Sequence, residues 1–134
     1  MRHQKQGKKL GRKKAPRKAL LRSQAIAFLS KGSIVTTEIK AKQLRSFAEK
    51  LISRGRKDNL SNRRYLLAKL NSRKIVDKII KEISPRYQTR PGGYCRLIKL
   101  GKRPGDNSPK VKIELIIDNE QTEAKKSNKK PDKK

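Results

Sequence analysis

Residues 88–101 read QTRPGGYCRLIKLG, and the hydrophobic pattern of the chain changes within this stretch. Before it, apolar residues recur every three or four positions, which is typical of helices that pack on one face. After Gly93 they alternate with polar residues, which is typical of strands with one buried side. Pro91, Gly92 and Gly93 predict a tight turn between these two halves. We therefore predict an α+β fold in which helices come first and a β-hairpin comes last.

The predicted hairpin is long and basic at its tip. Its strands are expected over residues 94–100 and 110–117, and the second strand carries its apolar side chains on one face. The segment GKRPGDNSP of residues 101–109 is dense in turn-forming residues. Lys102 and Arg103 are therefore expected at the tip of the hairpin.

The helical half of the chain predicts about four helices packed on a small mixed sheet. The apolar periodicity places these helices at about residues 17–31, 38–54, 59–70 and 73–84. Gly32 and Gly55 are predicted to end the first two helices, and Pro85 to stop the fourth. A short β-branched run at residues 33–36 predicts one further strand.

Other side chains of the helical half carry local predictions. Thr37 and Ser72 are candidate N-caps of the second and fourth helices. Leu60, Leu67 and Leu70 are predicted to face the core on the third helix.

The apolar residues define three regions of the chain. Residues 15–118 hold 29 of the 30 Leu, Ile, Val and Phe residues, so this region is predicted to be a single domain. Residues 1–14 predict a basic extended arm, and residues 119–134 a disordered charged tail, because neither segment can bury a core.

The charge of the chain points to a polyanionic partner. The 39 Lys and Arg residues against 11 Asp and Glu residues give a net charge of +28. Nucleic acid is the commonest partner for such an excess, and an anionic membrane surface is a weaker candidate. No segment approaches the roughly 20 consecutive apolar residues of a spanning helix. One cysteine, Cys95, excludes an internal disulfide and fits a reducing compartment.

The sequence argues against catalysis, a metal and a cofactor. The one histidine, His3, lies in the arm, and Cys95 lies in a predicted strand, where it is expected to pack. Metal signatures need several Cys and His residues at set spacings, and none is present. Nucleotide-binding loops run from a strand through glycines into a helix, whereas the order around Gly92 and Gly93 is the reverse. We expect a protein that is not an enzyme.

Basic clusters on several elements predict binding to a folded, irregular nucleic acid. No helix-turn-helix, zinc-finger, RRM or KH signature is present, so phosphate and shape recognition of structured RNA fits best. Gly92 and Gly93 allow close approach of backbone to phosphate. Tyr87 and Tyr94 are candidates for stacking on unpaired bases, and a place in the core is an equal alternative for Tyr94. The predicted RNA-binding residues are Arg2, His3, Lys5, Lys8, Lys9, Arg12, Lys13, Lys14, Arg17, Lys18, Arg22, Lys42, Arg45, Arg54, Arg56, Lys57, Arg63, Arg64, Arg86, Tyr87, Arg90, Gly92, Gly93, Tyr94, Arg96, Lys102 and Arg103.

Two alternatives from other classes stay open at this point. A general architectural or DNA-compacting protein would also carry this charge, and it would bind duplex DNA as well as structured RNA. An RNA-processing enzyme would need an acid–base pair or a metal cluster in one site, and the sequence offers neither.

Four blocks of sequence closely resemble bacterial ribosomal protein seventeen of the large subunit. The resemblance extends over about residues 1–117 and ends with KIELI at residues 112–116. The matching blocks are MRHQKQGKKLGR at 1–12, RKALLRSQAIAFL at 17–29, TTEIKAKQLRSFAEKLI at 36–52 and RPGGYCRLIKLGKRPGD at 90–106. Pro16 and Ser23 depart from the family pattern, in which His and Asn are usual.

The resemblance implies a mixed α/β fold that is embedded in large-subunit ribosomal RNA and has a structural role in translation. It implies a place on the solvent side near the exit of the peptide tunnel. Neighbouring ribosomal proteins would be in contact, with protein thirty-two of the large subunit as one candidate. It further implies the bacterial cytoplasmic ribosome, with an organellar ribosome as the alternative, and the match from the first residue argues against a cleaved presequence.

Overall fold

The computed structural model describes residues 8–116. The predictions for Arg2, His3, Lys5, Ile117 and the tail at residues 119–134 lie outside this part of the chain.

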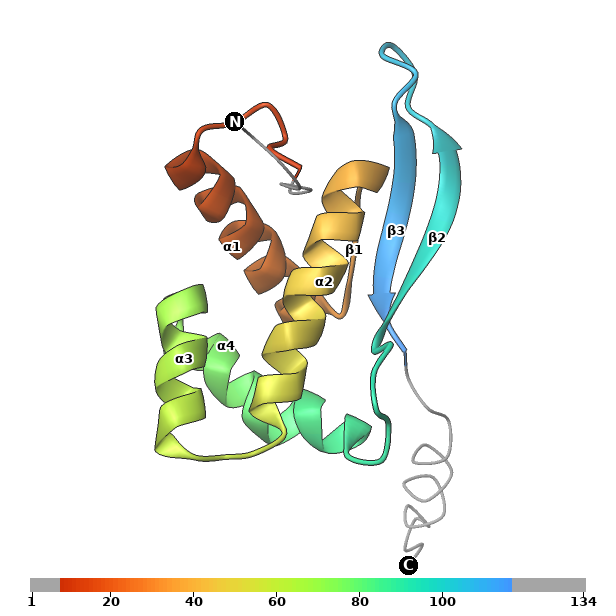
Figure 1. Ribbon diagram of the computed structural model, residues 1–134. Helices are drawn as coiled ribbons and strands as arrows, with labels where there is room; N and C mark the ends of the chain where they lie inside the picture. Colours follow the sequence, from red (N-terminus) through yellow and green to blue (C-terminus); the bar gives the residue numbers. More distant parts are fainter. Residues whose placement is uncertain (1–7, 117–134) are drawn as a thin grey trace, which may run out of the picture.

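The described chain forms an α+β fold with the helices first and the hairpin last, as the sequence predicts (Figure 1). Two short helical turns, η1 and η2, follow the fourth helix and lead toward the hairpin. The elements in chain order are α1 (Lys14–Lys31), β1 (Ser33–Thr37), α2 (Glu38–Gly55), α3 (Leu60–Leu70), α4 (Arg73–Lys78), the π-helical turn η1 (Ile79–Ile83), the 3-10 turn η2 (Ser84–Tyr87), β2 (Cys95–Lys102) and β3 (Pro109–Leu115).

The three strands form an antiparallel sheet in the order β1-β3-β2. Ile113 of β3 pairs with Ile34 of β1 on one side and with Leu97 of β2 on the other. Because both pairings are antiparallel, β1 runs parallel to β2. These two parallel strands are not neighbours, because β3 lies between them. The sheet is therefore antiparallel and not mixed as the sequence predicts.

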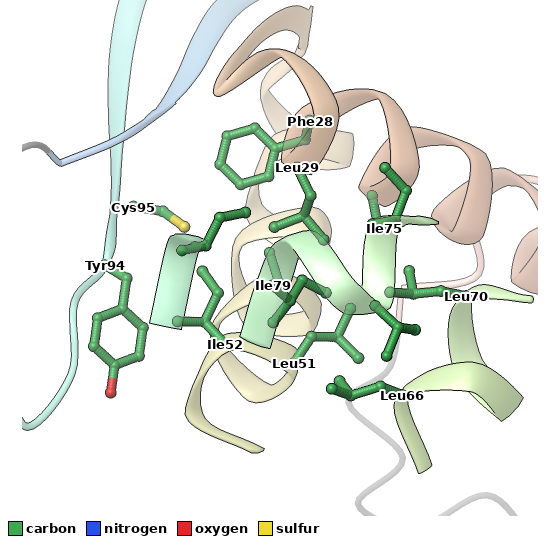
Figure 2. Close-up of a cluster of buried hydrophobic side chains, with 14 of the residues drawn as sticks. Phe28, Leu29, Leu51, Ile52, Leu66, Leu70, Ile75, Ile79, Tyr94 and Cys95 are labelled. Atoms are coloured by element: carbon green, nitrogen blue, oxygen red, sulfur yellow. The ribbon is translucent and has the colours of Figure 1, made fainter. Parts of the chain in front are cut away.

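One hydrophobic core joins the helices to the inner face of the sheet (Figure 2). Leu51 and Ile52 of α2 lie at its centre, between side chains of α1, α3, α4 and the start of β2. On α3 the buried leucines are Leu66 and Leu70, whereas Leu60 is 62% exposed. The prediction for Leu60 is wrong. Leu60 is the first residue of α3 and lies off the i, i+4 face that Leu66 and Leu70 define.

The helix ends follow the sequence in part. Gly32 adopts a left-handed φ of 81° and donates its N–H to the Phe28 carbonyl at 2.7 Å, as expected of a glycine after a helix. Helix α1 begins at Lys14, three residues before the predicted start. Pro16 fits the third helical position, because the first N–H groups of a helix have no intrahelical acceptor.

Two capping predictions and one stop prediction are not met. Thr37 and Ser72 occupy N-cap positions, but their side chains form no capping hydrogen bond. Asn59 caps α3 instead, since its Oδ1 accepts from the Asn62 N–H at 2.8 Å. Pro85 does not stop the helical path, because it lies in the first turn of η2, where its missing N–H costs no hydrogen bond.

Gly55 is required by close packing at the end of α2. The residue is buried, and the following Arg56 has a right-handed φ of −65°, so no left-handed turn is needed here. A Cβ at position 55 would lie 2.5 Å from Ser84 Oγ and 2.6 Å from Ile79 Cγ2. Ser84 Oγ also donates to the Ile52 carbonyl at 3.0 Å, which holds η2 against α2.

We predict that Gly55→Ala destabilises the protein by about 1–3 kcal/mol, because the new methyl group overpacks the contact with Ser84 and Ile79. Gly92→Ala is the matched control, since a Cβ there meets no atom within 4 Å and the expected change is below about 0.5 kcal/mol. Urea unfolding of both variants measures the difference. Equal unfolding midpoints for the two variants would contradict the packing argument.

Candidate nucleic-acid interface

The starts of α1 and α2 and the turn of the hairpin lie at the same end of the molecule (Figure 1), and these segments are rich in Lys and Arg. We call this end the arm–hairpin surface. Its Lys and Arg residues are Lys8, Lys9, Arg12, Lys13, Lys14, Arg17, Lys18, Lys42, Lys99, Lys102, Arg103 and Lys110. Lys99 and Lys110 belong to this surface but are not among the predicted RNA-binding residues. For Lys110 the available signal was its place in β3, directly before the buried Val111.

The two acidic residues of the arm–hairpin surface are already paired. Glu38 Oε1 lies 2.6 Å from Lys42 Nζ, and Asp106 accepts from Arg103. The pKa of Glu38 is lowered first by the Lys42 hydrogen bond and charge, and further by the charges of Lys99 and Lys8. Lys8 and Lys99 of β2 therefore both lie close enough to Glu38, at the start of α2, for their charges to act on it. The other ten cations have no carboxylate partner among residues 8–116.

The hairpin tip is closed by an ion pair. Arg103 Nε donates to Asp106 Oδ1 at 3.1 Å, and the Ser108 N–H donates to the same oxygen at 3.2 Å. The Arg103 hydrogen bond, followed by that of Ser108, lowers the pKa of Asp106 to about 2. Arg103 thus has a structural partner, whereas the exposed Lys102 beside it has no carboxylate partner among residues 8–116.

Arg56 fastens the turn before β2 to the end of α2. Its guanidinium donates to the carbonyls of Gln88 at 2.5 Å and Arg90 at 3.4 Å, and to the Tyr94 hydroxyl at 3.4 Å. Gln88 Nε2 returns a hydrogen bond to the Arg56 carbonyl at 3.2 Å. The position where the hairpin starts therefore depends on Arg56, which was predicted only as an RNA contact.

Three further predicted residues also have partners within the protein. Arg63 donates to Asp58 at 2.6 and 2.9 Å and to Asp77 at 3.1 Å, and its hydrogen bond lowers the pKa of Asp58. Arg22 donates to the Lys69 carbonyl at 3.0 Å, which joins α1 to α3. Arg45 pairs with Glu49 at 3.1 Å along α2.

The remaining predicted residues lie at or near the surface. Arg96 is 3.9 Å from Glu114 across the hairpin. Arg90 Nε donates to the Gly92 carbonyl at 3.2 Å. Gly93 has a left-handed φ of 66°, so the turn requires a glycine there, as its place in the Pro-Gly-Gly turn indicates. Lys57, Arg64 and Arg86 are exposed, and they belong to the α2–α3 loop, to α3 and to η2, segments that lie away from the arm–hairpin surface (Figure 1).

The stacking prediction for Tyr87 and Tyr94 is wrong, and the alternative of a core position for Tyr94 is confirmed. Both residues are 1% exposed, and their ring centroids lie 5.0 Å apart inside the core. The Tyr87 hydroxyl donates to the Ile116 carbonyl at 2.7 Å. Each tyrosine therefore anchors the end of the sheet to the helical half and offers no face to a base.

Sequence reasoning missed Tyr65, the one tyrosine among residues 8–116 that is not fully buried. Its ring centroid lies 5.2 Å from the Arg54 guanidinium carbon and 5.5 Å from Lys69 Nζ. Its sequence neighbour Arg64 is the signal that could have found it, because an aromatic ring among cations is typical of nucleic-acid surfaces.

Burial raises the pKa of the Cys95 thiol to about 12, so this side chain packs in the core, as predicted. Within residues 8–116, His, Cys, Asp and Glu form no group of three that could hold a metal ion. None of the helices in that range is long and apolar enough to cross a bilayer.

A family model described as Ribosomal protein L17 matches residues 20–116 of this chain. The large ribosomal subunit protein bL17 of Geobacter metallireducens is 45% identical over 133 residues, which cover 99% of this chain and 74% of the relative. The protein of the same name from Syntrophotalea carbinolica is 44% identical over 116 residues, covering 87% and 75% of the two chains.

We predict that Arg56→Gln destabilises the fold by about 1–3 kcal/mol, because it removes charged hydrogen bonds to two carbonyls and a buried tyrosine. Lys57→Gln removes one exposed charge next to it, with an expected change below about 0.5 kcal/mol. Thermal and urea unfolding measure both variants. An unchanged stability of Arg56→Gln would show that the turn is held by other contacts.

We predict that the Asp106 carboxyl titrates at about 2 in the folded protein. Because this pKa is below that of the unfolded chain, the ion pair stabilises the hairpin tip above about pH 4 and is lost as the pH falls through the folded value. In Arg103→Gln the midpoint should rise toward about 3.9. Carbon-detected NMR of the carboxyl group measures it, and Arg96→Gln should leave it unchanged.

Proposed function

Because this chain belongs to the ribosomal protein L17 family and is a structural, non-enzymatic constituent of the large ribosomal subunit, we propose that it binds folded large-subunit ribosomal RNA through phosphate and shape contacts. The arm–hairpin surface is the main contact. Its basic side chains meet phosphates of more than one RNA segment, screen their repulsion and thereby fix their packing.

The uncompensated charge of the arm–hairpin surface carries this proposal. The arm–hairpin surface carries twelve Lys and Arg residues and two acids, Glu38 and Asp106, each of which is paired with one of these cations. A protein surface of this composition repels itself until a polyanion covers it. Each phosphate that replaces condensed counterions contributes to binding, which makes the affinity strongly dependent on salt.

The N-terminal end of α1 strengthens the attraction for phosphate. This helix begins on the arm–hairpin surface, and its unpaired N–H groups and dipole favour anions. Helix α1 has no acidic residue in its first turn, and Lys13 at its N-cap position forms no side-chain cap. The backbone at this helix end can therefore donate to phosphate oxygens.

The shape of the arm–hairpin surface favours folded RNA over regular duplex. The start of α1 and the hairpin stand on either side of the first turn of α2 (Figure 1). Two projecting basic elements can each contact a different RNA segment, whereas one groove of a duplex is commonly read by a single helix or ribbon. The division into an arm at residues 1–14, a domain at 15–118 and a tail at 119–134 is part of this proposal.

The finer parts of the proposal rest on the sequence resemblance. We place the protein on the solvent side of the large subunit near the exit of the peptide tunnel, in the cytoplasmic ribosome. Neighbouring ribosomal proteins, with protein thirty-two as the candidate, would contact it there. Hydroxyl-radical footprinting of reconstituted subunits tests this position, which is rejected if the protected nucleotides lie away from the tunnel exit.

We predict a steep salt dependence for binding to large-subunit RNA, with a log–log slope near −6 to −7 for about 8 phosphate contacts. Lys14→Gln/Lys18→Gln should make the slope shallower by about 1 to 2, since two contacts of the arm–hairpin surface are lost. Filter binding or fluorescence anisotropy measures this slope between about 50 and 300 mM salt.

Lys74→Gln/Lys81→Gln is the matched control, because these two lysines are equally exposed but lie on α4 and η1, away from the arm–hairpin surface. It should leave the slope within about 0.5 of the unmodified protein. A slope shallower than about −2 for the unmodified protein would contradict the proposal. Equal affinity for duplex DNA in competition would instead indicate a general architectural protein.

A further inference from the structure

A second basic hollow lies at the other end of α2. An open groove of about 430 Å³ separates the second half of α2 from α3 and from the turn before β2. This volume is within the range of about 300–1,000 Å³ that small ligands occupy in proteins. The groove is lined by Ser46, Glu49, Lys50, Ser53, Arg54, Tyr65, Pro91, Gly92 and Tyr94.

From the composition of this groove we propose that it binds one unpaired nucleotide of RNA. The inference rests on the proposed function, because it assumes that RNA reaches this side of the protein. It adds a site for a base, whereas the arm–hairpin surface offers sites for phosphates. Lys50 lies 12 residues after Glu38 on α2, so the two sites are separated by about 18 Å along the helix axis at 1.5 Å per residue.

Two planar groups in the groove are suited to a base. The Tyr65 ring is partly exposed, and its hydroxyl forms no hydrogen bond among residues 8–116. The Arg54 guanidinium lies over the ring at 5.2 Å, which holds both groups in a defined orientation. Tyrosine rings and arginine planes are the surfaces on which proteins stack unpaired bases, and paired bases inside a duplex cannot reach them.

The charges around the groove favour a phosphodiester. Lys50 and Arg54 line it, and Lys69 lies beside the Tyr65 ring. The one acid of the lining, Glu49, is paired with Arg45 at 3.1 Å, so it does not neutralise them. The Ser46 and Ser53 hydroxyls add donors and acceptors for the ribose or for a base edge.

The opposite wall of the groove leaves room for a flat ligand. Gly92 has no side chain, and a Cβ there would meet no atom within 4 Å. Pro91 and the buried Tyr94 complete this wall, which Arg56 fixes in place through the Tyr94 hydroxyl. A base that enters between Gly92 and Tyr65 therefore meets a rigid site.

A neighbouring hollow supports a strand of RNA over a free small molecule. It shares Ser53 and Arg54 with the groove and continues toward Arg56, Lys57 and Gln88. Two adjoining hollows with a shared arginine form a path along which consecutive nucleotides can lie, as in single-strand binding sites. An isolated nucleotide would need only the first of them.

The test compares full-length variants assembled into large ribosomal subunits. We expect Tyr65→Leu and Arg54→Gln each to expose the same one or two nucleotides to 2′-hydroxyl acylation, by about 3-fold or more, because a base loses its stacking partner. The affinity for large-subunit RNA should fall by about 5- to 100-fold, the range for removing one aromatic–base stack. Tyr65→Phe keeps the ring and should match the unmodified protein.

Arg73→Gln is the matched control, because Arg73 is exposed at the start of α4, is not among the predicted RNA-binding residues and does not line the groove. Circular dichroism verifies folding, and Arg54→Gln keeps the test valid if Tyr65→Leu unfolds, since Arg54 is exposed. The inference is overturned if Arg54→Gln and Arg73→Gln give the same acylation pattern.

The nature of the occupant is tested by a photoreactive phenylalanine at position 65. Cross-linking to one RNA nucleotide supports the inference, and cross-linking to a ribosomal protein overturns it. If the groove variants behave as the control while steep salt-dependent RNA binding persists, the groove proposal fails and the proposed function stands. If the unmodified protein shows no such binding, the proposed function itself fails.

Discussion

The structure depends on the close contact between the end of α2 and the segment that follows α4. Gly55 allows Ser84 and Ile79 to approach the α2 backbone, and Arg56 then binds the turn that begins the hairpin. Because α2 runs from the arm–hairpin surface to the groove beside Tyr65, this contact fixes both basic sites on one rigid helix. A change in the packing at Gly55 would therefore move the hairpin relative to the helices, and with it the spacing of the cations that we propose to meet RNA phosphates.

Electrostatic repulsion adds to the loss of chain entropy that this small core has to offset on folding. The chain carries a net charge of +28, and the acidic residues of the described part do little to reduce the field where it is strongest. Several of them instead hold the fold together locally: Asp58 and Asp77 both bind Arg63 between α3 and α4, and Asp106 closes the hairpin tip. The cations around the start of α1 are left without carboxylate partners. This division keeps the arm–hairpin surface available to a polyanion.

The two proposed RNA sites would act together because the protein holds them at a fixed distance. Once phosphates engage the arm–hairpin surface, the groove near Tyr65 meets its nucleotide as an intramolecular partner at high effective concentration. Phosphate contacts would supply most of the affinity, and the stacked base would fix the register of the RNA on the protein. A rigid spacer between a charged site and a stacking site is a means by which a small structural protein can select one arrangement of flexible RNA segments.

Local sequence patterns determined the elements of this protein, the left-handed positions at Gly32 and Gly93, the packing role of Cys95 and the basic character of its surface. These properties depend on near neighbours along the chain, which periodicity and turn chemistry report directly. The tertiary structure decided which side chains are available for function. Arg56 and Tyr94 are residue types common in RNA sites, yet they are used inside the protein, because folding joins them to each other across 38 residues of sequence. Tyr65 became a candidate only when folding brought Arg54 and the turn before β2 beside it, a juxtaposition that no local pattern encodes.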